Sequence, residues 1–283
     1  MESLICDISL RDLIEAGAHF GHQTRRWNPK MKIYIFEEKN GLHIINLAKT
    51  LQQLRHSLPF IRQVVEGNKS ILFVGTKKQA KCVVRDAAIE AGEFFVSERW
   101  LGGMLTNMAT IRNSVKTLDK IERNFEHNPS FFTKKEIALL AKKQQKIIKN
   151  LEGVRYMKKL PGLLIVVDPS YEKIAVAEAR KLNIPVLALV DTNCDPAPID
   201  HVIPCNDDSL KSIRLIINVI KENIIQVKKK LGITIVSPIK ISAGGFPSFT
   251  EEFDDSHPEE EEDTNSDQCE DLLAKKFDNA ENL

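Results

Sequence analysis

Short apolar runs alternate with amphipathic segments through the middle of the chain. The runs are Ile71 to Val74, Phe94 to Val96, Leu163 to Val167, Val186 to Val190 and, the weakest, Val202 to Ile203. Consecutive apolar residues bounded by Gly, Pro or Asp are typical of strands that are buried on both faces, as in a parallel sheet. Segments with apolar residues every three or four positions lie between or after these runs, at 77–91, 171–182 and 210–231. This alternation predicts a doubly wound α/β domain.

The N-terminal part of the chain follows a different pattern. Ser9 and Asp12 have the spacing of a capping box, which predicts a short helix. Apolar residues on both sides of Asn40-Gly41 predict a β-hairpin, and we expect a long helix after it that is kinked at Pro59. Residues 19–30 have neither the helical nor the strand period, so an exposed basic and aromatic loop is expected there.

One connection between predicted strands is much longer than a crossover requires. About sixty residues separate the second and third apolar runs, whereas most connections take fewer than about fifteen. Apolar residues recur in steps of three or four from Met108 to Phe125 and from Ile137 to Val154, with Gln144 as a polar exception. Two long amphipathic helices joined by a short polar turn form an antiparallel hairpin. Residues 106–159 are therefore predicted to be an inserted coiled-coil arm.

The charge is distributed unevenly over the predicted parts. Residues 1–105 and 160–232 would form the parallel α/β domain, together with the N-terminal helix, the basic loop and the hairpin. Residues 233–283 contain fourteen acids and three lysines, which predicts an acidic and largely disordered tail. The chain before this tail has 37 basic and 25 acidic residues, so the overall charge of +1 conceals a basic body. Such asymmetry indicates a polyanionic partner, for example a nucleic acid.

The arm has the most skewed charge within that body. From Thr106 to Lys159 it has thirteen Lys or Arg and five acids. Lysines recur along its second helix, off the apolar seam, at Lys134, Lys135, Lys142, Lys143, Lys146 and Lys149. A basic rod suits a phosphate backbone, because each neutralised phosphate releases condensed counterions. A solvated helix face is the alternative, but such faces usually mix both signs, so we favour the polyanion.

Two arginine–tryptophan pairs add candidate nucleic-acid contacts. The loop contains Arg25, Arg26, Trp27 and Lys30, and Arg99 precedes Trp100. Arginine can bridge phosphates, and tryptophan can stack on an unpaired base. Packing of each tryptophan into the domain, with its arginine in solvent, is an equally good interpretation.

A glycine turn after the first apolar run offers a phosphate site. Gly75 is followed by Thr76, Lys77 and Lys78 at the predicted start of a helix, where backbone amides and ammonium groups could meet an anion. The spacing of a Walker A loop is absent, as is a GxGxxG motif followed by an acid. The turn is therefore a weak nucleotide site. It is either a phosphate contact with a polynucleotide or a loop at the edge of the domain whose lysines are simply solvated.

Other chemistry finds little support in the sequence. Asp191, Cys194, His201 and Cys205 could together suggest zinc, but their intervals match no common zinc finger, and we expect no metal and no other cofactor. The motifs of serine hydrolases, zinc proteases and kinases are missing, so no catalytic residues are predicted. Five scattered cysteines and the lack of an apolar stretch long enough to span a membrane predict a cytoplasmic protein.

Four segments carry a resemblance to a known family. They are AGAHFGHQTRRWNPKM from Ala16 to Met31, GTKKQA from Gly75 to Ala80, RWLGGMLTN from Arg99 to Asn107 and VDTNCDP from Val190 to Pro196. Together, and in this order, they closely resemble the bacterial form of the second protein of the small ribosomal subunit, over about residues 9–232. The acidic tail is not part of the shared pattern.

The resemblance implies a flavodoxin-like parallel sheet of five strands with an inserted antiparallel coiled-coil hairpin, and no enzymatic activity. It further implies binding to small-subunit ribosomal RNA where the head meets the body, and help in docking the large mRNA-binding protein of the same subunit. The implied RNA-facing residues are Arg25, Arg26, Lys30, Lys77, Lys78, Arg99 and the arm lysines. No membrane and no small-molecule substrate is expected. Two alternatives stay open, namely an α/β enzyme or nucleotide-binding switch that uses the Gly75 turn, and a coiled-coil adaptor for another protein.

Overall fold

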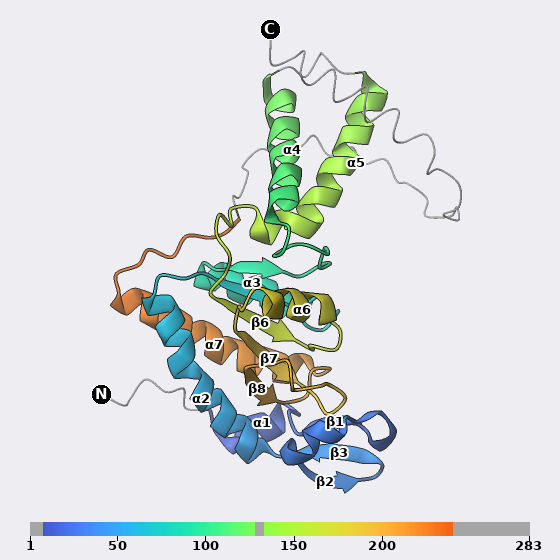
Figure 1. Cartoon of the computed structure of the whole chain (residues 1–283), viewed down its shortest axis with the longest axis vertical. Helices are drawn as coiled ribbons and strands as arrows, with labels where there is room; N and C mark the ends of the chain where they lie inside the picture. The colour runs from blue at the N-terminus through green and yellow to red at the C-terminus, as the bar shows by residue number, and fades with distance from the viewer. Residues whose placement is uncertain (1–7, 128–132, 240–283) are drawn as a thin grey trace. The chain divides into compact units, whose positions relative to one another are not determined.

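The computed structural model describes residues 8–127 and 133–239 (Figure 1). The described residues divide into two compact units, one within 8–115 and 145–239 and one within 116–144. The predicted acidic tail lies mostly outside the described residues. Among those described, no helix combines the length and the apolar character needed to cross a membrane.

Five parallel strands form the centre of the first unit. In chain order they are β4 (Ile71–Val74), β5 (Phe94–Val96), β6 (Leu163–Val167), β7 (Val186–Val190) and β8 (His201–Pro204). They pair in the order β5-β4-β6-β7-β8, and each neighbouring pair is parallel. Counted along the chain, this is the 2-1-3-4-5 order of flavodoxin-like folds. The predicted parallel five-stranded sheet is therefore confirmed.

Helices cover both faces of this sheet (Figure 1). On one face α2 (Leu47–Glu66), α3 (Lys81–Ala91) and α7 (Leu210–Lys230) share a core with strand residues such as Phe73. On the other face α6 (Lys173–Lys181) shares a core with strand residues such as Leu72. Because successive side chains of a strand point to opposite faces, covering both faces requires the continuous apolar runs seen in the sequence.

Two helices begin later than their apolar pattern predicts. After β4 the chain makes a turn before α3 starts at Lys81, and after β6 it makes another before α6 starts at Lys173. In the second turn Asp168 has a φ of 59°, and its Oδ1 accepts hydrogen bonds from the backbone N–H groups of Ser170 and Tyr171. Both turns place polar side chains at the carboxyl edge of the sheet. The helix α2 continues through Pro59.

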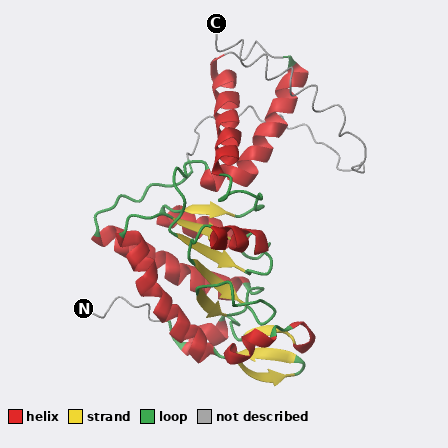
Figure 2. Ribbon diagram, viewed as in Figure 1, coloured by secondary structure: helices red, strands yellow, loops and turns green. Residues whose placement is uncertain are grey.

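A small antiparallel sheet follows the N-terminal helix, as the strands in Figure 2 show. The helix α1 (Leu10–Glu15) has the predicted capping box, and β2 (Ile35–Lys39) with β3 (Leu42–Ile45) forms the predicted hairpin. The prediction of a loop throughout residues 19–30 was wrong at β1 (Phe20–Gln23), which pairs with β3. The rest of this segment lies in two 3₁₀ helices, η1 (Thr24–Arg26) and η2 (Pro29–Tyr34).

The inserted segment contains α4 (Met108–His127), α5 (Lys134–Leu151) and the short η4 (Glu152–Val154). A capping box precedes α5, where the Thr133 N–H donates to Glu136 and the Glu136 N–H donates back to Thr133 Oγ1. Within the second unit the seam residues Leu118, Ile121 and Leu140 are buried. The two predicted helices are thus present, and their pairing as a coiled coil stays a prediction.

Candidate functional site

Charged residues lie within three positions of the carboxyl ends of four parallel strands. Lys77 comes after β4, Asp168 after β6, Asp191 after β7 and Asp207 after β8. Since the carboxyl ends of parallel strands lie at the same edge of a sheet, these side chains converge there. The point between β4 and β6, where the strand order reverses, is where flavodoxin-like folds usually bind a ligand.

The ammonium group of Lys77 lies among three carboxylates at this edge. Its Nζ is 2.6 Å from Asp207 Oδ1, 2.6 Å from Asp208 Oδ1 and 3.3 Å from Asp168 Oδ2. Burial by itself lowers the pKa of Lys77, but the hydrogen bonds to Asp207 and Asp208 outweigh it, so the pKa is raised. Lys77 is thus charged and has its partners within the chain. This geometry argues against a direct phosphate contact by Lys77.

The Gly75 turn is packed tightly against its own helix. A Cβ at Gly75 would lie 2.8 Å from Val84 Cγ2, so the glycine permits close packing of strand and helix. The next residue, Thr76, donates from its backbone N–H and its hydroxyl to Glu172 Oε1, at 2.7 and 2.6 Å. Acids therefore occupy the place where a nucleotide phosphate would sit. This arrangement disfavours the alternative of a nucleotide-binding switch.

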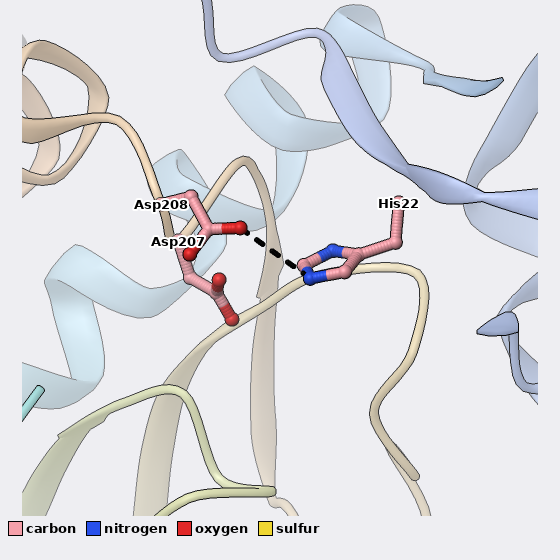
Figure 3. Close-up of side chains that lie close together, drawn as sticks. All are labelled: His22, Asp207 and Asp208. Atoms are coloured by element: carbon pink, nitrogen blue, oxygen red, sulfur yellow. Dashed lines mark ion pairs between the residues drawn. The ribbon is translucent and has the colours of Figure 1, made fainter.

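The strand β1 brings His22 to the same edge. Gly21 lies so close to Thr192 that a Cβ would be 2.7 Å from its Cγ2, and the His22 N–H donates to Thr192 Oγ1 at 2.9 Å. This contact places His22 Nδ1 3.0 Å from Asp191 Oδ2 and Nε2 3.4 Å from Asp208 Oδ2. The hydrogen bond to Asp191 raises the pKa of His22. Figure 3 shows the imidazole ring beside the carboxylates of Asp207 and Asp208.

The four candidate zinc ligands of the sequence do not come together as a set. Cys194 lies near Asp168, with its Sγ 3.5 Å from Oδ1. His201 begins β8 and stacks on Phe60 at 4.5 Å between ring centroids, whereas Cys205 follows the other end of the strand. Four residues of strand span about 13 Å, which is too far for one ion. The zinc interpretation of this quartet is therefore wrong.

The carboxylate of Glu178 organises the loop between β5 and α4. It accepts hydrogen bonds from Trp100 Nε1, from the backbone N–H groups of Gly103, Leu105 and Thr106, and from Thr106 Oγ1, at 2.7–3.1 Å. The sequence interpretation missed this role. The only signal of this role in the sequence is that Glu178 directly precedes Ala179, a residue on the apolar stripe of the predicted helix.

The predicted RNA-binding residues of the N-terminal segment lie at the surface. Arg25 and Arg26 in η1 are exposed, and so is Lys30, which forms an ion pair with Asp195 at 2.8 Å. Trp27 is half-buried, with its ring 4.9 Å from that of His43. The two arginines are thus available to a partner, and Trp27 offers only part of its surface.

The remaining predicted cations are also exposed, with one partial exception. Lys78 and Arg99 are exposed, whereas Trp100 is buried with its indole N–H bonded to Glu178. Of the arm lysines, Lys143 is half-exposed, and the exposed ones are Lys134, Lys135, Lys142, Lys146 and Lys149. Trp100 is therefore packed into the domain, as one of the two interpretations of the sequence expected. The predicted RNA-binding cations lie at the surface, except for Lys77 and, in part, Lys143.

A family model described as Ribosomal protein S2 matches residues 13–227 of the chain. The match covers both sheets and the inserted helices. All four segments on which the resemblance rests, from Ala16 to Pro196, lie within the matched residues.

Similar full-length sequences carry a related description. A protein of Chlamydia pneumoniae described as small ribosomal subunit protein uS2 is 72% identical over 283 residues, which is the whole of both chains. Proteins of the same description are 68% identical over 235 residues in Chlamydia trachomatis serovar D and 64% identical over 224 residues in Protochlamydia amoebophila. These alignments cover 83% and 79% of this chain and 83% and 82% of those relatives.

Proposed function

Since this chain belongs to the ribosomal protein S2 family, we propose that it is a structural constituent of the small ribosomal subunit and binds the RNA of that subunit. The family predicted from the four segments is confirmed. Membership in a family of ribosomal proteins also agrees with the prediction that the chain is not an enzyme. The cytoplasm, predicted from the cysteines, is where such a subunit works.

The observation that carries the proposal is the surface position of the predicted cations. Arg25 and Arg26 are exposed on one short helix, Lys78 on the turn after β4 and Arg99 after β5. Each can neutralise a phosphate, and the release of condensed counterions makes such binding favourable and dependent on salt. Lys77 has a structural role in this proposal, because its charge is balanced by Asp168, Asp207 and Asp208.

We further propose that α4 and α5 pair as an antiparallel coiled coil whose lysines contact RNA. The burial of Leu118, Ile121 and Leu140 supports this pairing, since all three lie on the apolar seams. The lysines of α5 lie off that seam, and most are exposed. A rod of this kind would give the protein a second basic surface for RNA.

A position near the junction of head and body, and docking of the large mRNA-binding protein, are proposals that follow from the family resemblance. The small antiparallel sheet offers one feature suited to a protein partner. Ile33, which lies just before β2, and Phe36, which lies within it, have 60% and 68% of their surface exposed. Exposed apolar side chains close together commonly mark protein contacts.

Two binding measurements separate this function from its alternatives. Small subunits lacking this protein are sedimented with the full chain at rising salt, and ATP, GTP and NAD are titrated against the chain alone. We expect co-sedimentation that falls steeply with salt, and no nucleotide binding. Saturable nucleotide binding would favour the switch, and self-association without affinity for the subunit would favour the adaptor.

A further inference from the structure

Gly102 is a glycine for which the fold of the chain itself gives no reason. Its φ lies outside the left-handed region, and a Cβ added to it would meet no described atom within 4 Å. Every other described glycine either has a positive φ or would place an added Cβ within 3.4 Å of another atom. Because glycine loses more conformational freedom on folding than any other residue, it lowers stability at this position without a benefit inside the chain.

We propose that the sugar–phosphate backbone of the ribosomal RNA lies directly against Gly102, in a contact that has no room for a side chain. A glycine in open space is typical of a place where a partner approaches the backbone closely. This inference rests on the proposed function and adds a site to it, because no residue between Leu101 and Asn107 is among the predicted RNA contacts.

The loop around Gly102 is held in place by hydrogen bonds. Three backbone N–H groups between Gly103 and Thr106 donate to the carboxylate of Glu178, at 2.7–3.0 Å. The Asn107 N–H donates to the carbonyl oxygen of Gly103 at 2.7 Å. A preorganised surface loses little conformational entropy when it binds a folded partner. Such a loop also cannot move aside to make room for a larger residue, so added bulk at Gly102 should push the partner away.

The side chains on both sides of Gly102 suit an RNA backbone. Arg99 is exposed before the loop, and Thr106 and Asn107 are exposed at its end. Arginine binds phosphate oxygens, and threonine and asparagine commonly contact phosphates and sugars. The Thr106 hydroxyl donates to Glu178 Oε2 at 3.1 Å, so its oxygen can still accept a hydrogen bond from a ribose 2′-hydroxyl.

A protein partner fits this loop less well. The centre of a protein interface is usually apolar, with large side chains that fill pockets of the partner. Met104 and Leu105, the large apolar residues in the middle of the loop, are buried, with 2% and 3% of their surface exposed. The exposed residues of the loop are small or polar, namely Gly102, Thr106 and Asn107. The contact is therefore assigned to RNA.

The experiment measures the affinity of the full chain for small-subunit ribosomal RNA at several salt concentrations. The wild type is compared with Gly102→Ala and Gly102→Leu, and Ala177→Leu is the matched control because it adds similar bulk at an exposed position of α6. We expect Gly102→Ala to bind about threefold and Gly102→Leu about tenfold more weakly, because the added atoms overpack the contact. Ala177→Leu should bind as the wild type does.

Two further readouts identify the cause of the loss. The slope of log K against log salt should be the same in Gly102→Leu as in the wild type, because no charge is removed. Arg99→Ala, by contrast, should make that slope shallower by about 0.9, because one phosphate contact is lost. The Tm of Gly102→Ala should equal or exceed that of the wild type, because the position has room for a methyl group and alanine restricts the unfolded chain.

The possible failures can be told apart. RNA binding by Gly102→Leu that equals that of the wild type would overturn the inference and leave the proposed function intact. A lower Tm in Gly102→Ala would also overturn it, because the fold itself would then require the glycine. If the Gly102 variants bind free RNA normally but fail to join small subunits that lack this protein, the contact is with a neighbouring protein and the assignment to RNA is wrong. A wild-type chain that binds no RNA would contradict the proposed function, and this inference with it.

Discussion

The indole Nε1 of Trp100 donates a hydrogen bond to Glu178 Oε1 at 3.1 Å, and this bond joins the loop after β5 to α6. The same carboxylate accepts bonds from three backbone N–H groups of that loop. One buried acid thus holds the chain in place just before the inserted helices begin. Arg99 is exposed beside it, so the position of a predicted RNA contact depends on Glu178.

Replacing Glu178 with glutamine should destabilise the protein by about 2–3 kcal/mol, because hydrogen bonds to a charged acceptor are lost and one amide group faces other donors. The free energy of unfolding in urea measures this change. Glu90→Gln is the control, since Glu90 forms an exposed ion pair with Lys221, and should cost less than about 1 kcal/mol. Equal losses in the two variants would contradict the role given to Glu178.

The contribution of Glu178 should depend on pH. Burial acts to raise the pKa of Glu178, but hydrogen bonds from Thr106, Gly103 and Trp100 outweigh it and lower the pKa. A carboxyl whose pKa is lower in the folded state stabilises the fold above its unfolded pKa of about 4.3. That stabilisation is lost as the pH falls through the folded pKa. The difference in unfolding free energy between wild type and Glu178→Gln should therefore be constant near neutral pH and shrink below about pH 4. A difference that grows on acidification would refute this account.

Substitutions of two adjacent lysines should affect different properties, namely stability for Lys77 and RNA binding for Lys78. Lys77→Met leaves Asp207 and its neighbours without their cation and should cost about 3–5 kcal/mol of stability. Lys78→Met alters an exposed side chain and should change stability by less than about 0.5 kcal/mol, while it weakens RNA binding. Urea denaturation of both variants provides the comparison. Similar stabilities would show that Lys77 does not hold the carboxyl edge together.

A side chain at position 75 should be tolerated only if the neighbouring Val84 is made smaller. In Gly75→Ala the new Cβ would lie 2.8 Å from Val84 Cγ2, which should cost about 1–3 kcal/mol through overpacking. Val84→Ala removes that methyl group, so the double variant should lose less stability than the sum of the two single variants. A double-mutant cycle by thermal unfolding measures this coupling. Strict additivity would mean that the contact does not limit the turn.

The sequence predicted most of the first unit because burial leaves a local signature. Both faces of the parallel strands are covered, so runs such as Leu163 to Val167 are wholly apolar and can be recognised without knowledge of their neighbours. The strand β1 was missed because Phe20 to Gln23 has no apolar alternation. It forms through pairing with β3 and contact with Thr192, which lies far along the chain.

The candidate sites could be predicted only in part, because contacts between residues that are far apart in the sequence leave no local signature. The sequence identified the exposed cations, because charge can be counted without a fold. It assigned Lys77 to phosphate, because the acids that pair with it lie 91 and 130 residues away. His201 and Cys205 are close in sequence, but an extended strand separates them. The cluster of His22, Asp207 and Asp208 forms only when β1 reaches the carboxyl edge of the sheet.

The most direct test of the account is the affinity of the full chain for small-subunit ribosomal RNA as a function of salt. The triple variant Arg25→Ala, Arg26→Ala, Lys78→Ala is compared with Lys173→Ala, Lys181→Ala, which removes exposed cations of α6 outside the predicted set. We predict that the triple variant binds the RNA more weakly than the wild type. The slope of log K against log salt should also be shallower by about two to three, because each lost phosphate contact removes roughly 0.9 from its magnitude. The α6 variant should behave as the wild type does. Equal losses in both variants, or no loss in the triple variant, would contradict the claim that these exposed cations bind the RNA.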